Sequence, residues 1–215
     1  MSAFAVQPRL CLILTRALCR LAPERVLEES VRGGADLVQL REKELHPREF
    51  AAWAADGLAL CKSLSVPMLV NDSVEIAALV GAAGVHLGQE DLEPSAARSM
   101  LGPRALIGWS THDPAQIAAA AAWGGAVNYL GFGPAFPTPT KGYDTGLGVD
   151  HVLAAARQAA LLGLPILAIG GIHPSNRASL GAGLGVAVCS ALCKAEDPKI
   201  VARSLLLPCN PSANA

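Results

Sequence analysis

Residues 67–88, PMLVNDSVEIAALVGAAGVHLG, contain two short apolar runs separated by a segment of helical character. The runs PMLVN (67–71) and GVHLG (84–88) are almost continuously apolar, which is typical of strands buried on both faces of a parallel sheet. Gly81 follows the helical segment, at the kind of position where a helix commonly ends. This stretch therefore predicts a strand–helix–strand unit of an α/β fold.

Six further runs of the same kind give eight predicted strands in all. The other six span residues 9–15, 35–40, 105–110, 126–133, 165–171 and 185–190. Six of the Ala- and Leu-rich segments between runs open with a proline that suits a first helical turn, namely Pro23, Pro47, Pro94, Pro114, Pro174 and Pro198. Eight such units with short loops favour one (β/α)8 barrel, a TIM barrel, over a doubly wound sheet. We place the barrel at 9–207 and expect flexible tails at 1–8 and 208–215.

Composition argues against two classes of protein. A net charge of −1 provides no basic surface for nucleic acid. The uncharged run 114–140 contains four prolines and several glycines, so it does not predict a membrane-spanning helix, and LCLIL (10–14) is too short for a signal peptide. The six cysteines form no Cys-x-x-Cys pair, which is typical of free thiols in a reducing compartment. We expect a soluble cytoplasmic protein with small-molecule substrates; a homo-oligomer is compatible with the sequence.

Polar side chains gather where the predicted strands end, although only 16% of the residues are charged, against roughly 25% in an average protein. The residues at these ends are Gln39, Leu40, Arg41, Glu42, Lys43, Asn71, Asp72, Gln89, Glu90, Asp91, Ser110, Thr111, His112, Thr138, Pro139, Thr140, Lys141, Gly170, Gly171, Cys189 and Ser190. The carboxyl ends of barrel strands meet at one rim, where the active sites of this fold lie. We therefore expect the site at this rim.

Two carboxylates, Asp72 and Asp91, follow neighbouring predicted strands. Mg²⁺ is commonly held by one or two carboxylates together with substrate phosphates, and Arg41, Lys43 and Lys141 would neutralise phosphate oxygens on the other side. The alternative is that each aspartate caps the helix that follows it and that the residues around Glu42 form a solvated turn. Taken together, the groups favour a metal-assisted anion site.

A second anionic subsite is predicted at strands seven and eight, because Gly170-Gly171 and Cys189-Ser190 occupy the usual place of a barrel's phosphate-binding amides. The sequence offers little acid–base machinery. His86 lies inside an apolar run and is expected to be a packed, hydrogen-bonded core residue, while His112 at the rim is either a substrate contact or a loop residue. Phosphate ligands, a metal and few acids or bases suit a reaction driven by departure of a diphosphate.

Seven motifs, in this order along the chain, resemble those of the thiamine phosphate synthase family. They are QLREK (39–43), ND (71–72), GVHLGQED (84–91), GWSTH (108–112), YLGFGPAFPTPTK (129–141), AIGGI (168–172) and VAVCS (186–190). The resemblance implies a (β/α)8 barrel and a transferase that joins hydroxymethylpyrimidine diphosphate to a thiazole phosphate with Mg²⁺. It also implies a dissociative mechanism, in which diphosphate leaves before the thiazole nitrogen captures a pyrimidine-methyl cation.

The resemblance assigns roles by motif. Pyrimidine diphosphate would be held by Gln39, Arg41, Lys43 and Asn71, Mg²⁺ by Asp72 and Asp91, and the diphosphate group by Ser110 and Lys141. Thr138 and Thr140 would border the thiazole, whose phosphate would rest on Gly171 and the amides of Cys189 and Ser190. Leu40, Glu42 and Pro139 are counted with the substrate-binding residues, and Arg41, Lys43, Ser110 and Lys141 with the catalytic ones.

Two positions depart from the family pattern. Arg16 follows Thr15 where the family often has an acidic residue, and Cys189 replaces an aliphatic one. Two rival functions are a thiazole tautomerase of the same barrel family, which uses a rim histidine and lacks the metal carboxylates, and a non-catalytic phosphate-sensing barrel. The presence of both Asp72 and Asp91 favours the synthase.

Overall fold

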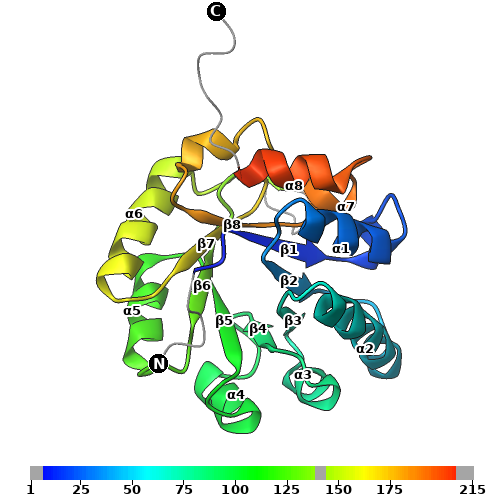
Figure 1. Ribbon diagram of the computed structural model, residues 1–215. Helices are drawn as coiled ribbons and strands as arrows, with labels where there is room; N and C mark the ends of the chain where they lie inside the picture. The colour runs from blue at the N-terminus through cyan, green and yellow to red at the C-terminus, as the bar shows by residue number, and fades with distance from the viewer. Residues whose placement is uncertain (1–6, 139–143, 207–215) are drawn as a thin grey trace, which may run out of the picture.

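Eight parallel strands close into a barrel with the helices arranged around it (Figure 1). The computed structural model describes residues 7–138 and 144–206. The strands are β1 (Leu10–Leu14), β2 (Leu37–Leu40), β3 (Met68–Asn71), β4 (Gly84–Leu87), β5 (Leu106–Thr111), β6 (Tyr129–Phe132), β7 (Ile166–Ile169) and β8 (Gly185–Val188). Each strand pairs with the next in the chain, and β1 pairs with β8. The predicted barrel and all eight predicted strands are confirmed.

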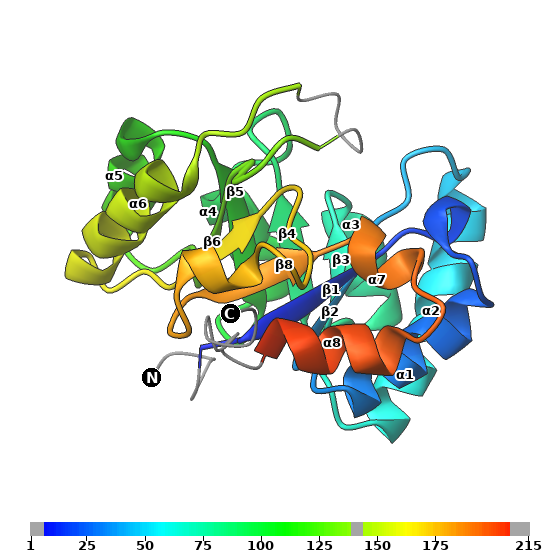
Figure 2. The same ribbon diagram turned by 90° about the horizontal axis from the view of Figure 1, so that it is seen from above.

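The helices alternate with the strands. They are η1 (Arg16–Leu18), α1 (Pro23–Arg32), α2 (Pro47–Ser63), α3 (Val74–Val80), α4 (Pro94–Leu101), α5 (Pro114–Ala122), α6 (Val149–Leu161), η3 (Arg177–Leu180), α7 (Ser190–Cys193) and α8 (Pro198–Leu206). Five of the six prolines predicted to open helices do so. In Figure 2, α5 and α6 lie on one flank of the barrel and α1 and α2 on the other. No helix within residues 7–138 and 144–206 is long and apolar enough to cross a membrane.

The prediction at Pro174 was wrong. Pro174 lies in a turn, and the 3-10 helix η3 begins only at Arg177. The side chain of Asn176 accepts a hydrogen bond from the backbone N–H of His173 (2.9 Å), which closes a local turn in place of a first helical turn. Of the two predicted tails, residues 1–6 and 208–215 lie outside the described residues. Pro8 is buried, and Gln7 Nε2 donates to the carbonyl of Ile166 (3.1 Å).

The apolar side chains of the strands form two cores. Those facing inward fill the barrel interior, where Cys11, Ile13, Leu37, Leu69, Leu106, Tyr129, Leu167 and Ala187 form one buried cluster. Their neighbours along the strands, such as Leu10, Leu12 and Leu14, belong to a larger cluster between the sheet and the helices. Burial on both faces explains why the strands read as continuous apolar runs. It also leaves the strand ends as the place for polar groups.

Candidate active site

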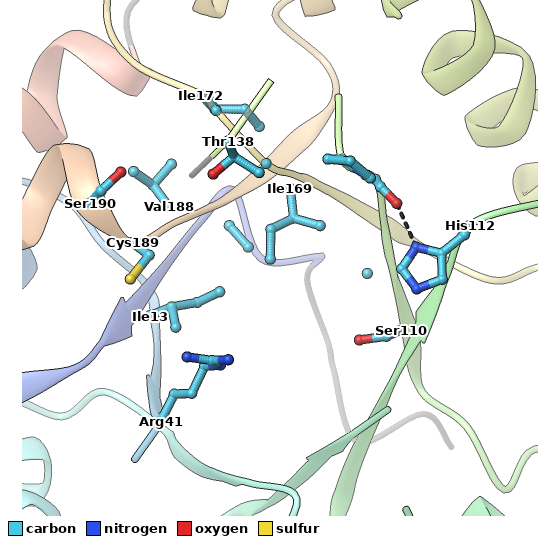
Figure 3. A pocket seen from close by; sticks show the side chains of 16 residues that line it. Ile13, Arg41, Ser110, His112, Thr138, Ile169, Ile172, Val188, Cys189 and Ser190 are labelled. Atoms are coloured by element: carbon cyan, nitrogen blue, oxygen red, sulfur yellow. Dashed lines mark hydrogen bonds between the residues drawn. The ribbon is translucent and has the colours of Figure 1, made fainter. Parts of the chain in front are cut away.

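A pocket opens at the carboxyl ends of the strands (Figure 3). Its lining comes from six strands and the loops that follow them, β1, β2 and β5 to β8, namely Ile13, Arg41, Ser110, His112, Gly131, Gly133, Pro134, Thr138, Ile169, Gly170, Gly171, Ile172, Ala187, Val188, Cys189 and Ser190. Arg41 and Ser110 lie at one end of the pocket, while Ser190 and Thr138 lie at the other. Two polar ends separated by apolar side chains suit a ligand, or a pair of ligands, with two polar groups.

The structure brings six of the predicted site residues into this pocket: Arg41, Ser110, Thr138, Gly171, Cys189 and Ser190. Four others, Lys43, Asn71, Asp72 and Asp91, follow or end the neighbouring strands β2 to β4. Gln39 and Leu40 are buried within β2. Pro139, Thr140 and Lys141 lie outside the described residues. The substrate and metal roles given to all these residues stay predictions.

The two predicted metal carboxylates lie close together. Asp72 interacts with Asp91 and forms an ion pair with Lys43, so the three groups make one cluster, none of whose members is among the residues that line the pocket. Asp91 Oδ2 also accepts a hydrogen bond from the backbone N–H of Gly88 (2.6 Å), which fixes the turn after β4. Burial raises the pKa of the Asp72 carboxyl, and contact with Asp91 raises it further, while Lys43 opposes both.

Neither aspartate caps a helix. Ser73 caps α3, because its side chain accepts a hydrogen bond from Ile76 N–H (3.2 Å), and Glu93 occupies the cap position of α4. Asp72 instead holds a left-handed backbone conformation, with φ of 65°, which is uncommon outside glycine and is tolerated by aspartate. The capping alternative is therefore wrong for both residues.

The cluster fits a hard divalent cation in its chemistry. Two adjacent carboxylates repel each other and provide oxygen ligands, which Mg²⁺ prefers. In the part of the chain that the structure describes, no group of three or more His, Cys, Asp or Glu side chains could hold a metal. Proteins commonly bind Mg²⁺ with one or two carboxylates, while substrate phosphates and waters provide its other ligands.

A chain of hydrogen bonds crosses the barrel interior to Ser110. His86 Nε2 lies 2.9 Å from Ser110 Oγ, and His86 Nδ1 lies 2.8 Å from the Tyr129 hydroxyl, which in turn interacts with Gln39. Burial raises the pKa of Tyr129 well above its ordinary value, so its hydroxyl stays protonated. If Tyr129 donates to Nδ1, His86 carries its proton on Nε2 and donates to Ser110. The hydroxyl proton of Ser110 is then available to a ligand.

Gly108 makes room for this chain of hydrogen bonds. A Cβ atom at position 108 would lie 2.3 Å from the Tyr129 ring and 2.4 Å from His86 Nδ1, far closer than van der Waals contact. Any other residue at this point of β5 would displace the two rings. The expectation that His86 is a packed, hydrogen-bonded core residue is confirmed, and its contact with Ser110 links that core to the pocket.

His112 lines the pocket from the end of β5. Its Nδ1 lies 2.6 Å from the carbonyl oxygen of Gly133, drawn as the dashed line in Figure 3. Because a carbonyl only accepts, Nδ1 carries the proton and a neutral His112 has its free acceptor at Nε2. Asp113 caps α5 by accepting from Gln116 N–H (3.0 Å), so the predicted helix start is also confirmed.

The other end of the pocket is built from backbone. Gly171 has φ of +62°, and a Cβ atom there would lie 2.4 Å from the carbonyl oxygen of Pro137. Asn176 Nδ2 donates to the carbonyl of Gly171 (2.8 Å) and holds this turn. Ser190 begins α7, beside it in the pocket. Backbone N–H groups in such turns bind anions, so this end suits a phosphate.

The residues after β1 turn away from the pocket. The Glu42 carboxylate accepts a hydrogen bond from Arg16 N–H (2.8 Å), and the Arg16 guanidinium lies 5.5 Å from the centre of the Trp53 ring. The carboxylate of Glu42 therefore ties the loop after β1 to the loop after β2. In this structure Arg16 packs over Trp53 and is not among the residues that line the pocket.

Sequence reasoning missed two parts of the site. The apolar wall, Ile13, Ile169, Ile172 and Val188, could not be separated from other apolar strand residues without knowing which side chains face the rim. The contact of His86 and Tyr129 was also missed, since it depends on the register between β4 and β6 across the barrel. The glycine spacing in GWSTH and YLGFG was the available signal, because small residues often mark close approach.

Three kinds of comparison place this chain among known proteins. The family model described as thiamine monophosphate synthase matches residues 10–192. Thiamine-phosphate synthase of Azorhizobium caulinodans is 43% identical over 192 residues, covering 86% of this chain and 89% of that protein. Thiamine-phosphate synthase of Chlorobium phaeovibrioides is 38% identical over 206 residues, covering 94% and 95%. Thiamine phosphate pyrophosphorylase from Pyrococcus furiosus has a similar solved structure, with a TM-score of 0.80, 29% identity and coverage of 92% and 93%.

Proposed function

Because the chain belongs to the thiamine monophosphate synthase family, we propose that it joins hydroxymethylpyrimidine diphosphate to a thiazole phosphate, giving thiamine phosphate and diphosphate. The observation that carries this proposal is the pocket itself. Arg41 and Ser110 at one end and the turns of Gly171 and Ser190 at the other offer two separate places for anionic groups. A condensation of two phosphorylated substrates needs both.

The diphosphate belongs at the Arg41 and Ser110 end. Arg41 and Lys43 supply positive charge there, and Ser110, hydrogen-bonded to His86 Nε2, would donate its proton to a diphosphate oxygen. Mg²⁺ would be held by Asp72 and Asp91, where it would neutralise charge on the departing diphosphate. Charge grows on the leaving group as its bond to carbon stretches, so these contacts strengthen toward the transition state.

The thiazole phosphate belongs at the backbone end. Gly171 and the amides of Cys189 and Ser190 would bind the phosphate, and Thr138 would border the ring. Between the two ends, Ile13, Ile169 and Val188 form an apolar wall. Such a wall keeps water from a pyrimidine-methyl cation, so that the thiazole nitrogen captures it. The bond-forming step requires no general base, in keeping with the few acid–base groups in the pocket.

The two rival functions have less support. A tautomerase of the same barrel would lack the paired carboxylates, whereas Asp72 and Asp91 are adjacent here. A phosphate sensor needs no such pair. Both curated relatives described above are named thiamine-phosphate synthases. A cytoplasmic location fits the free thiols of all five described cysteines, and assembly into a homo-oligomer stays an expectation.

The test is to incubate the purified protein with both substrates and Mg²⁺ and to separate the products by chromatography. Thiamine phosphate is expected only when both substrates are present. Two control reactions, each with one substrate omitted, detect the rival activities: conversion of the thiazole phosphate to a tautomer by the protein alone would favour the tautomerase, and binding without any product would favour the sensor. Either result would contradict the proposal.

A further inference from the structure

Three thiols meet next to the pocket, at the seam where β1 and β8 close the barrel. The Cys193 thiol on α7 interacts with those of Cys19 and Cys189 and donates to the carbonyl of Ile13 (3.5 Å). All three surround Thr15: Cys19 Sγ lies 3.4 Å from its carbonyl oxygen, and Cys189 Sγ lies 4.0 Å from its hydroxyl. The chemistry proposed for the pocket uses none of these sulfur atoms.

We propose that Cys19 and Cys193 form a modification site at which a hydroperoxide oxidises Cys19 and Cys193 then closes a disulfide. The geometry already suits this bond, because the two segments are joined by a hydrogen bond from Arg20 N–H to the carbonyl of Cys193 (2.9 Å). η1, just before Cys19, also packs against α7. The two thiols are also close enough to interact, as a disulfide between them requires.

Cys19 is the sulfur that a peroxide would reach first. It is partly exposed, whereas Cys193 is buried. The interaction with the Cys193 thiol lowers the pKa of Cys19, which favours the thiolate that reacts with peroxides. Hydrogen bonding to Cys189 lowers the pKa of Cys193, but its contact with Cys19 and its burial outweigh this and raise the pKa to about 12. Cys193 therefore stays a thiol, and its Sγ donates to the carbonyl of Ile13 (3.5 Å).

The reaction balances in two steps. The Cys19 thiolate attacks the hydroxyl oxygen of the hydroperoxide, so that a sulfur–oxygen bond forms and the oxygen–oxygen bond breaks. Cys19 becomes a sulfenic acid, and the other oxygen leaves as an alkoxide, or as hydroxide from hydrogen peroxide, which takes a proton from water. The Cys193 sulfur then attacks the Cys19 sulfur. The disulfide forms as the sulfur–oxygen bond breaks, and the departing hydroxide takes the proton of the Cys193 thiol and leaves as water.

The other cysteines provide a contrast. Burial raises the pKa of Cys61 to about 12, and Cys11 is fully buried in the barrel interior. No other cysteine thiol contacts either of them among the interactions of the described residues. A disulfide between Cys19 and Cys193 would link the first and last βα units across the seam of the barrel. Such a cross-link stabilises a fold because it constrains the unfolded chain. We expect the oxidised protein to have a higher Tm than the reduced protein.

The experiment treats the full chain with hydrogen peroxide, blocks the remaining thiols and digests the protein with trypsin. The expected product is peptide 17–20 joined to peptide 178–194, detected by mass spectrometry and lost on reduction. Because peptide 178–194 contains both Cys189 and Cys193, three variants identify the partner. The link should persist in Cys189→Ala and in the control Cys61→Ser, and it should disappear in Cys193→Ser.

Cys19→Ser, at a partly exposed position, should also abolish the link and the rise in Tm, which keeps the test decisive if Cys193→Ser does not fold. Absence of the linked peptide from the oxidised wild-type protein would overturn the proposal. A link that persists in Cys193→Ser, and so joins Cys19 to Cys189, would overturn it as well. The readout does not depend on the proposed enzymatic activity.

Discussion

His86 on β4 holds Ser110 on β5: its Nε2 lies 2.9 Å from the serine hydroxyl, while its Nδ1 is bound to Tyr129 at 2.8 Å. Through this contact a residue buried in the barrel interior fixes the orientation of a hydroxyl that lines the pocket. His86 is therefore a positioning residue in the proposed reaction, acting through Ser110.

Replacing His86 tests this role. Asparagine is too short to bridge Tyr129 and Ser110, so His86→Asn should lower kcat about 10- to 100-fold, as loss of precise positioning commonly does, with little change in the KM for thiazole phosphate. The decisive measurement is a double-mutant cycle with Ser110→Ala. In the Ser110→Ala background, adding His86→Asn should lower kcat little further. If the losses of kcat in the two single variants add fully in the double variant, His86 does not act through Ser110.

Asp91→Asn tests the metal cluster. The asparagine oxygen can still accept the hydrogen bond from Gly88 N–H, so the turn and the fold should survive. Turnover should fall by about 10²–10³, as when one stabiliser of transition-state charge is removed. The neighbouring exposed residue provides a matched control, Glu90→Gln, whose activity should stay near that of the wild type. A folded Asp91→Asn protein with normal Mg²⁺-dependent turnover would refute the assignment.

Gly171→Ala tests the phosphate end of the pocket. The left-handed φ and the close carbonyl of Pro137 both oppose a methyl group, so the turn must shift and the KM for thiazole phosphate should rise about 10-fold or more. Gly163→Ala is the control, because its φ of +71° is equally unfavourable but nothing lies within 4 Å of the added carbon. It should lose stability without a change in KM. Equal KM values for the two variants would contradict the role of Gly171.

Arg98→Lys, on α4, tests a set of hydrogen bonds that stabilises the fold away from the pocket. Its guanidinium donates to the carbonyls of Gly102, Ala105 and Ala126 and to Asn128 Oδ1 at 2.6 Å, which joins α4 to the loops before β5 and β6. Lysine cannot reproduce this fan of hydrogen bonds, so Arg98→Lys should lower the free energy of unfolding by about 1.5–3 kcal/mol. Urea denaturation measures this free energy of unfolding. The exposed Arg104→Lys is the control, and an equal loss there would contradict the explanation.

The fold could be predicted because each strand carries its own signal. PMLVN is apolar on both faces and GVHLG is buried on both faces, with His86 on the inner one, and such a short buried run indicates a strand between helices and a barrel interior. The residues at the strand ends could be predicted for the same reason, since the barrel brings successive ends to one rim. Asp72 and Asp91 thereby came together although they lie on different loops.

Contacts across the barrel could not be predicted in this way. The interaction of His86 with Tyr129 depends on the strand register and on the space left at Gly108, neither of which periodicity reveals. The meeting of Cys19 with Cys193 depends on closure of β1 against β8, at opposite ends of the chain. The turn at Pro174 differed because the Asn176 side chain competes with the helix for backbone N–H groups.

The most direct test of the proposed function compares two initial rates in one reaction, the release of diphosphate and the formation of thiamine phosphate. The proposal predicts equal rates, both requiring Mg²⁺ and both substrates, and a parallel fall of the two rates in Asp91→Asn. Diphosphate release that continues without thiazole phosphate at an undiminished rate, or a thiazole phosphate that is changed without any thiamine phosphate being formed, would contradict it.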